Sequence, residues 1–117
     1  RALARRFDNA FRDLGITHGQ FSLLMSLNRP EPARMADVAA VLAMDRTTLT
    51  AALKPLRRRR LATVSVDRGD KRGRHLALTA RGRALLAEAL PIWESEHAAL
   101  DARLAASDPQ RLRGDLK

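Results

Sequence analysis

Residues 62–86, ATVSVDRGDKRGRHLALTARGRALL, contain the local signals that decide the fold. The segment ATVSV at 62–66 alternates and is rich in β-branched residues, which is typical of a strand, and RHLALT at 74–79 alternates again. Between them, DRGDKRG at 67–73 carries two glycines among charged residues, as turns do. Thr79 can cap the long helical segment that follows. The sequence therefore predicts a two-stranded β-hairpin that leads directly into a long helix.

Two shorter helices precede the hairpin, separated by the tight connection AMD. Asp45 is expected to cap the second of these helices, residues 46–60. Pro55 lies within this helix and removes one of its backbone hydrogen bonds. Its inward face is predicted from helical spacing to hold Leu49, Ala52, Leu53 and Leu56. The outward face is polar or small: Thr47, Thr48, Thr50, Ala51 and Lys54. The first helix of this pair is predicted at residues 34–43. The two helices together are typical of a helix-turn-helix, with the hairpin as its wing.

Further helices are predicted at both ends of the chain. Residues 2–14 form one amphipathic segment, whose apolar face is Leu3, Phe7, Ala10, Phe11 and Leu14. Gly15 ends it, and Thr17 can cap a second helix with Phe21, Leu24 and Met25 facing inward.

The last predicted helix, residues 80–106, is expected to kink at Pro91. Its apolar stripe is Leu85, Leu86, Ala89, Trp93, Leu100 and Leu104. A new cap at Ser107 or Asp108 is expected after it. Because a small winged domain cannot cover the apolar faces at 2–14 and 85–104 alone, we expect a homodimer.

The net charge of +9 is confined to one part of the chain. Residues 54–83 hold eleven basic and two acidic residues, whereas the remainder holds eleven of each. Such clustering favours a polyanionic partner, and the alternative is a solvated basic face kept for solubility.

Composition limits the cellular compartments and the kinds of binding site that we expect for this chain. The chain has no cysteine, which excludes disulfides and thiolate metal sites, and no apolar run long enough to span a membrane. Its charged start does not resemble a signal peptide. We therefore expect one cytoplasmic domain with no membrane association.

Three segments in this order resemble the MarR family of winged-helix bacterial transcriptional regulators: GITHGQFSLLMSL, ADVAAVLAMDRTTLTAALKPL and DKRGRHLALTARGRALL. The resemblance implies a mainly α fold with a small β-hairpin wing, flanked by N- and C-terminal dimerisation helices. A single domain 1–117 would comprise dimerisation helices at 1–28 and 80–117 and a winged helix-turn-helix lobe at 29–79. The implied function is that of a sequence-specific DNA-binding regulator, a homodimeric repressor of a pseudo-palindromic operator.

The resemblance also implies which residues contact DNA. In the family's wing an acidic residue holds an arginine extended for the minor groove, which matches Asp70 and Arg72 here. The expected DNA-binding residues are Arg34, Arg46, Thr47, Thr48, Thr50, Lys54, Arg68, Asp70, Lys71, Arg72 and Arg74. Two positions depart from the family pattern: Arg60 stands where glycine usually ends the recognition helix, and Arg34 stands where a Ser or Thr cap is common.

A pocket for a small apolar or aromatic anionic ligand is a further implication of the family. Its expected lining is Phe11, His18, Phe21, Met25 and Trp93, and the alternative is that these residues only pack the core. No spacing of residues indicates a metal site, a cofactor or catalysis. The other functions left open are a protein-interaction module with the same fold and a non-specific architectural DNA-binding protein.

Overall fold

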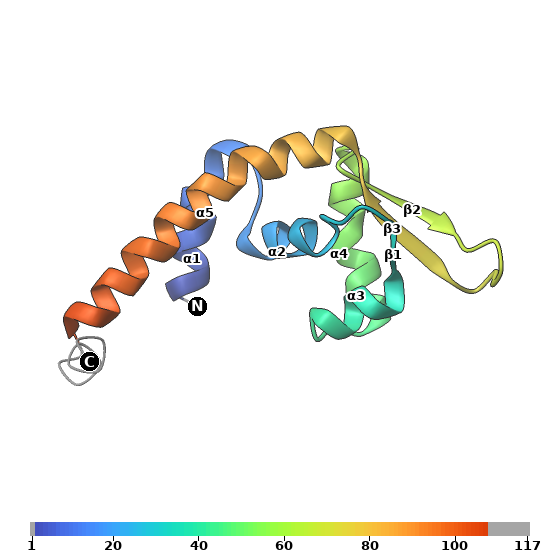
Figure 1. The fold of residues 1–117 in the computed structure, drawn as a ribbon, viewed down its shortest axis with the longest axis horizontal. Helices are drawn as coiled ribbons and strands as arrows, with labels where there is room; N and C mark the ends of the chain where they lie inside the picture. Colours follow the sequence, from blue (N-terminus) through green and yellow to red (C-terminus); the bar gives the residue numbers. More distant parts are fainter. Residues whose placement is uncertain (1, 108–117) are drawn as a thin grey trace.

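The computed structural model describes residues 2–107, which form several helices and one small sheet. The elements in chain order are α1 (Ala2–Ala10), the 3-10 helix η1 (Arg12–Leu14), α2 (His18–Ser26), β1 (Ala33–Arg34), α3 (Met35–Val41), α4 (Arg46–Arg58), β2 (Ala62–Val66), β3 (Arg74–Leu78) and α5 (Ala80–Ser107). In Figure 1, α5 runs from the base of the β2–β3 hairpin to the far end of the molecule, and the hairpin projects in the opposite direction. The helix-turn-helix, formed by α3 and α4, lies beside the hairpin.

The sheet has three antiparallel strands in the order β1-β3-β2, so the expectation of a two-stranded hairpin was incomplete. Ala33 pairs with Leu76, and Arg34 pairs with His75. The helix expected at 34–43 is shorter, since α3 spans only Met35–Val41. A two-residue strand has no alternation of its own, and its pairing depends on β3, which lies about forty residues later in the chain.

A single apolar core joins the helices to the sheet. The inward face predicted for α4 is confirmed, since Leu49, Leu53 and Leu56 are buried and the outward threonines are exposed. In α2 the prediction for Met25 is wrong, because this side chain is 38% exposed while Leu23 is buried in its place.

The predicted helix ends at Thr17 and Asp45 are confirmed. Thr17 forms a capping box with Gln20, and the Asp45 carboxylate accepts a hydrogen bond from the Thr48 backbone N–H at 2.7 Å. Arg60 adopts a left-handed φ of 60°, and Arg34 precedes α3 without a side-chain cap. Arg60 therefore adopts a positive φ although it is not glycine, and α3 begins without the cap that a Ser or Thr side chain can supply.

Proline does not interrupt either helix that contains it. Pro55 lies within α4 and Pro91 within α5, and both helices remain continuous. Figure 1 shows that α5 bends part of the way along its length. Ser107 is the last residue of α5. Asp108, the other cap expected there, and the segment after it lie outside the described residues, as does the side chain of Leu3.

Candidate nucleic-acid interface

The outward face of α4 is polar, exposed and fixed in direction by the buried leucines behind it. Thr47, Thr48, Thr50 and Lys54 are all exposed, as the sequence indicated. The Thr50 hydroxyl donates to the Arg46 carbonyl at 2.8 Å, so its proton is engaged and its oxygen remains available as an acceptor. The face offers short hydroxyl side chains and one flexible cation to a partner.

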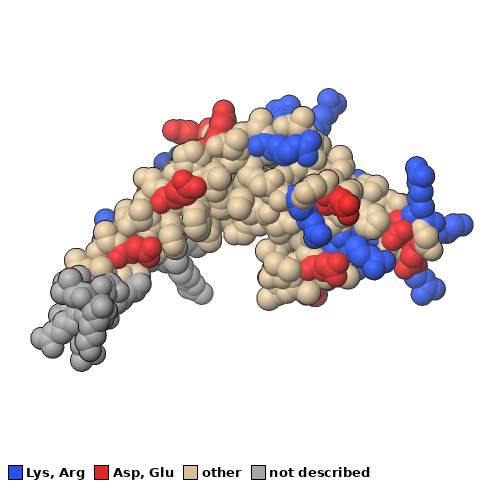
Figure 2. All heavy atoms as spheres, viewed as in Figure 1, with Lys and Arg blue, Asp and Glu red and all other residues tan. Residues whose placement is uncertain are grey.

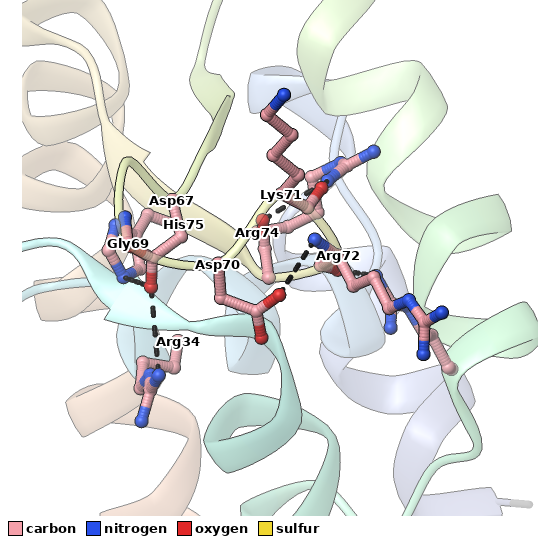
Figure 3. A network of polar contacts seen from close by, with 10 residues as sticks. Arg34, Asp67, Gly69, Asp70, Lys71, Arg72, Arg74 and His75 are labelled. Carbon is pink, nitrogen blue, oxygen red and sulfur yellow. Dashed lines mark hydrogen bonds and ion pairs between the residues drawn. The ribbon is translucent and has the colours of Figure 1, made fainter.

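The wing tip is an Asx turn built around Asp70. One Asp70 carboxylate oxygen accepts a hydrogen bond from the Arg72 backbone N–H at 3.0 Å, and the Asp70 carbonyl accepts one from the Gly73 N–H at 2.9 Å. The Asp70 carboxylate therefore holds Arg72 through its backbone N–H, as Figure 3 shows. Within residues 2–107 the guanidinium of Arg72 has no ion-pair partner.

Arg46 connects the wing to α4. Its guanidinium donates to the backbone carbonyl of Arg72 at 2.9 Å. Arg74 holds the same turn from the other side, donating to the carbonyls of Lys71 at 2.8 Å and Gly73 at 3.1 Å. Two arginines expected to contact DNA therefore also fix the backbone of the wing.

The base of the wing is held by a cluster around Asp67. Its carboxylate accepts a hydrogen bond from the Gly69 N–H at 2.8 Å and lies 3.5 Å from the His75 imidazole and 3.6 Å from the Arg34 guanidinium (Figure 3). The Gly69 hydrogen bond is the main reason that the pKa of Asp67 lies below its ordinary value, and the charges of His75 and Arg34 add to it. The sequence did not single out Asp67 or His75 as site residues, because β1 brings Arg34 to them only in the folded chain.

The charge is asymmetric over the whole surface. In Figure 2 most of the lysine and arginine side chains gather over the winged lobe, where some acidic side chains lie among them, and the charged side chains seen along the outer part of α5 are mainly acidic. Arg68 and Lys71 are exposed in the turn between β2 and β3. The residues expected at the interface thus lie on one lobe, from β1, α4 and the wing.

A separate apolar hollow of about 370 Å³ lies between α2 and α5. Its lining is His18, Phe21, Ser22, Met25, Leu90 and Trp93. The expectation for Phe11 is wrong, since this ring is fully buried behind Phe21, with 5.0 Å between the ring centroids. Ser22 and Leu90 were missed, although each lies at helical spacing from a residue that was named.

The described residues contain neither a metal-binding cluster nor a membrane-spanning helix. No group of three or more His, Cys, Asp or Glu side chains converges within residues 2–107. In the same part of the chain, no helix is both long enough and apolar enough to cross a bilayer.

Comparison with known proteins gives a consistent result. The model of the MarR family matches residues 14–73. The chain is 36% identical to the Mycobacterium tuberculosis transcriptional regulator MosR, whose crystal structure is a complex with DNA; the match covers 99% of this chain and 83% of MosR with a TM-score of 0.78. It is 27% identical to the transcriptional repressor CouR bound to a 23-mer DNA duplex, over 98% of this chain and 79% of CouR, with a TM-score of 0.79.

A third structure shares the fold at lower identity. The Staphylococcus aureus MepR–DNA complex is 22% identical, with a TM-score of 0.83 over 98% of this chain and 85% of MepR. No match was found among the curated protein sequences.

Proposed function

The chain belongs to the MarR family of transcriptional regulators, and from this premise we propose that it is a homodimeric repressor of a pseudo-palindromic DNA operator. The observation that carries the proposal is the winged lobe, on which an exposed polar helix and a basic wing lie side by side. The DNA complexes of MosR and CouR, both more than a quarter identical, support DNA as the partner.

The mechanism follows from the two elements. The N-terminal half of α4 would enter the major groove, where Thr47, Thr48 and Thr50 meet base edges and thymine methyl groups. Arg72 would enter the adjacent minor groove, whose narrow walls concentrate negative potential. Because the Asp70 and Arg46 bonds already fix the Arg72 backbone, the backbone of the wing tip loses less entropy on entry.

A dimer would repeat this arrangement on two half-sites. We propose the division anticipated from the sequence, with the winged lobe at 29–79 and dimerisation helices at 1–28 and 80–117. Half-sites separated by one helical turn, about 34–36 Å, would match the two recognition helices.

Selection of binding sites from random DNA tests the proposal. A recovered palindrome would support a dimeric, sequence-specific regulator. Selection without enrichment, combined with equal affinity for all duplexes, would instead favour a non-specific architectural protein. If the protein fails to bind DNA at low salt, this result would favour a protein-interaction module instead of a DNA-binding regulator.

We also propose that a small, mainly apolar anion releases the repressor from DNA. The support is the hollow beside α2 and α5, where two aromatic rings and one imidazole form the walls. A ligand there acts only if it prefers a spacing of the two lobes that differs from the spacing DNA requires. A thermal-shift screen of phenols and aromatic carboxylates tests this: a hit must also release the operator, and His18→Ala should weaken both effects.

A further inference from the structure

The four consecutive arginines at 57–60 belong to the basic stretch, but the proposed interface does not use them. Arg59 donates from Nη1 to the Gly15 carbonyl at 2.8 Å and from Nη2 to the Leu14 carbonyl at 3.2 Å, so it ties the end of α4 to the end of η1. The carbonyl of Arg60 accepts a hydrogen bond from the Thr79 hydroxyl at 2.6 Å, just before α5 begins. These two residues therefore hold the lobe together.

The side chains of Arg57 and Arg58 differ from that of Arg59. Both side chains are exposed, and within residues 2–107 neither guanidinium makes a hydrogen bond or an ion pair. The side chains of Arg57 and Arg58 point in different directions, because neighbouring residues on a helix are about 100° apart around its axis.

Arg57 lines a continuous depression between α4 and the sheet, here named the basic trough. It consists of three hollows of about 310, 160 and 420 Å³. Arg46 and Arg74 line both the first and the second hollow, and Arg57 and Val64 line both the second and the third, so the three adjoin. The charged residues that line the trough are six arginines, Arg34, Arg46, Arg57, Arg60, Arg72 and Arg74, and two acidic residues of the first hollow, Asp37 and Asp70. Arg58 lines none of these three hollows.

The position of the trough has a consequence for DNA. If α4 occupies the major groove and the wing occupies the adjacent minor groove, the strand that separates these grooves must pass between α4 and the wing. That space is the basic trough. We propose that the trough holds the sugar–phosphate backbone of one strand, and that Arg57 binds a phosphate there. This inference rests on the proposed DNA-binding function.

The geometry suits a phosphate contact at Arg57. Arg46, Thr50 and Arg57 recur at spacings of four and seven, which places them on one face of α4. From Arg46 to Arg57 the helix rises about 16 Å. Each strand carries one phosphate per about 3.4 Å of duplex axis, so this length accommodates more than one phosphate. Because the Arg57 guanidinium has no protein partner within residues 2–107, it breaks no existing ion pair when it binds bidentately to a phosphate.

The test compares Arg57→Gln with Arg58→Gln. The two variants remove the same charge from adjacent exposed positions, and thermal unfolding checks that both fold like the wild type. Affinity is measured against salt concentration with two probes: a duplex recovered by selection and a random-sequence duplex of equal length. For Arg57→Gln we expect the slope of log K against log[salt] to become shallower by about 0.9 per lost phosphate contact, hence about 1.8 for a dimer.

The expected pattern is specific in three ways. Arg57→Gln should weaken binding to both duplexes by the same factor, since phosphates carry no sequence information. Arg58→Gln should leave the slope unchanged, and Arg57→Lys should keep most of it because the charge remains. Equal loss in the two glutamine variants, no loss in either, or a loss confined to the selected duplex would each overturn the assignment. A wild type that binds neither duplex would instead refute the proposed function itself.

Discussion

Arg72 lies at the tip of the wing with its backbone held from two sides and its side chain exposed. The Asp70 carboxylate binds its N–H, and Arg46 binds its carbonyl. Both contacts involve the backbone, so they survive the loss of the side chain. This separation allows the DNA contact to be tested without damage to the turn.

Arg72→Ala should weaken binding to the selected operator by about 1–3 kcal/mol per arginine. The free energy of unfolding should stay unchanged, because no buried group is lost. Fluorescence anisotropy with operator DNA measures the first quantity and chemical denaturation the second. Arg103→Ala, at an exposed position on α5, is the control. Wild-type affinity in a folded Arg72→Ala protein would remove Arg72 from the interface.

Gly82, in the first turn of α5, is required by a close approach of two backbones. A Cβ at this position would overlap the carbonyl oxygen of Leu61. Helix propensity alone predicts that Gly82→Ala stabilises the helix by up to about 1 kcal/mol. The overlap involves backbone, which cannot rotate away, so we expect the opposite sign.

Gly82→Ala should therefore lower the free energy of unfolding by about 1–3 kcal/mol. Gly19 is the matched control, because a Cβ there meets only the Thr17 hydroxyl at 3.8 Å, and Gly19→Ala should be neutral or stabilising. Urea denaturation of both variants measures the difference. Stabilisation by Gly82→Ala would show that the α5–Leu61 contact is looser than the structure indicates.

At the scale of elements, α4 is fixed at both ends by charged side chains. Asp45 caps its N-terminus, and Arg59 joins its C-terminus to the carbonyls at the end of η1. The hydrogen bond from the Thr48 backbone N–H is the largest cause that lowers the pKa of Asp45 from its ordinary value of 3.8. A recognition helix held at both ends presents its polar face in one direction.

The pH dependence of stability should reveal this cap. Because the pKa of Asp45 is lower in the folded than in the unfolded chain, its contribution is fully present above about pH 3.8 and is lost as pH falls through the folded pKa. Asp45→Ala should therefore be less stable than the wild type at pH 7, and the difference should shrink in acid. Asp45→Asn keeps an acceptor and should retain part of the cap at every pH. A difference between wild type and Asp45→Ala that stays constant to well below pH 3.8 would contradict the charged cap.

At the scale of the whole molecule, the structure changes which residues can form a dimer. Phe7 and Phe11, part of the apolar face assigned to dimerisation from the sequence, are 3% and 0% exposed within a single chain. Polar replacements there would unfold the protein rather than separate subunits. The outer half of α5 differs, since it extends beyond the winged lobe, and Leu104 is 43% exposed there.

Replacement of Leu100 and Leu104 together by glutamate should convert a dimer to a monomer, because charge at an apolar interface is costly to desolvate. Sedimentation velocity measures the oligomeric state. Ala98→Glu adds charge at an exposed position of the same helix and should leave the dimer intact. A double variant that sediments as the wild-type dimer would place the interface elsewhere.

The sequence by itself determined the features whose physical cause is local. Apolar spacing of three and four residues predicted the inward face of α4, alternation predicted β2 and β3, and short polar side chains predicted the caps at Thr17 and Asp45. Each of these depends on groups within a few residues of one another, so the necessary information is contiguous in the chain.

Only the tertiary structure decided the features that depend on contacts between distant segments. It added β1 to the sheet, buried Phe11 behind Phe21, and brought Arg34 and His75 to Asp67. It also separated Arg57, which lines the basic trough, from Arg58, which does not. Charge and hydropathy are the same for these two arginines, and only the packing of α4 against the sheet gives them different surroundings.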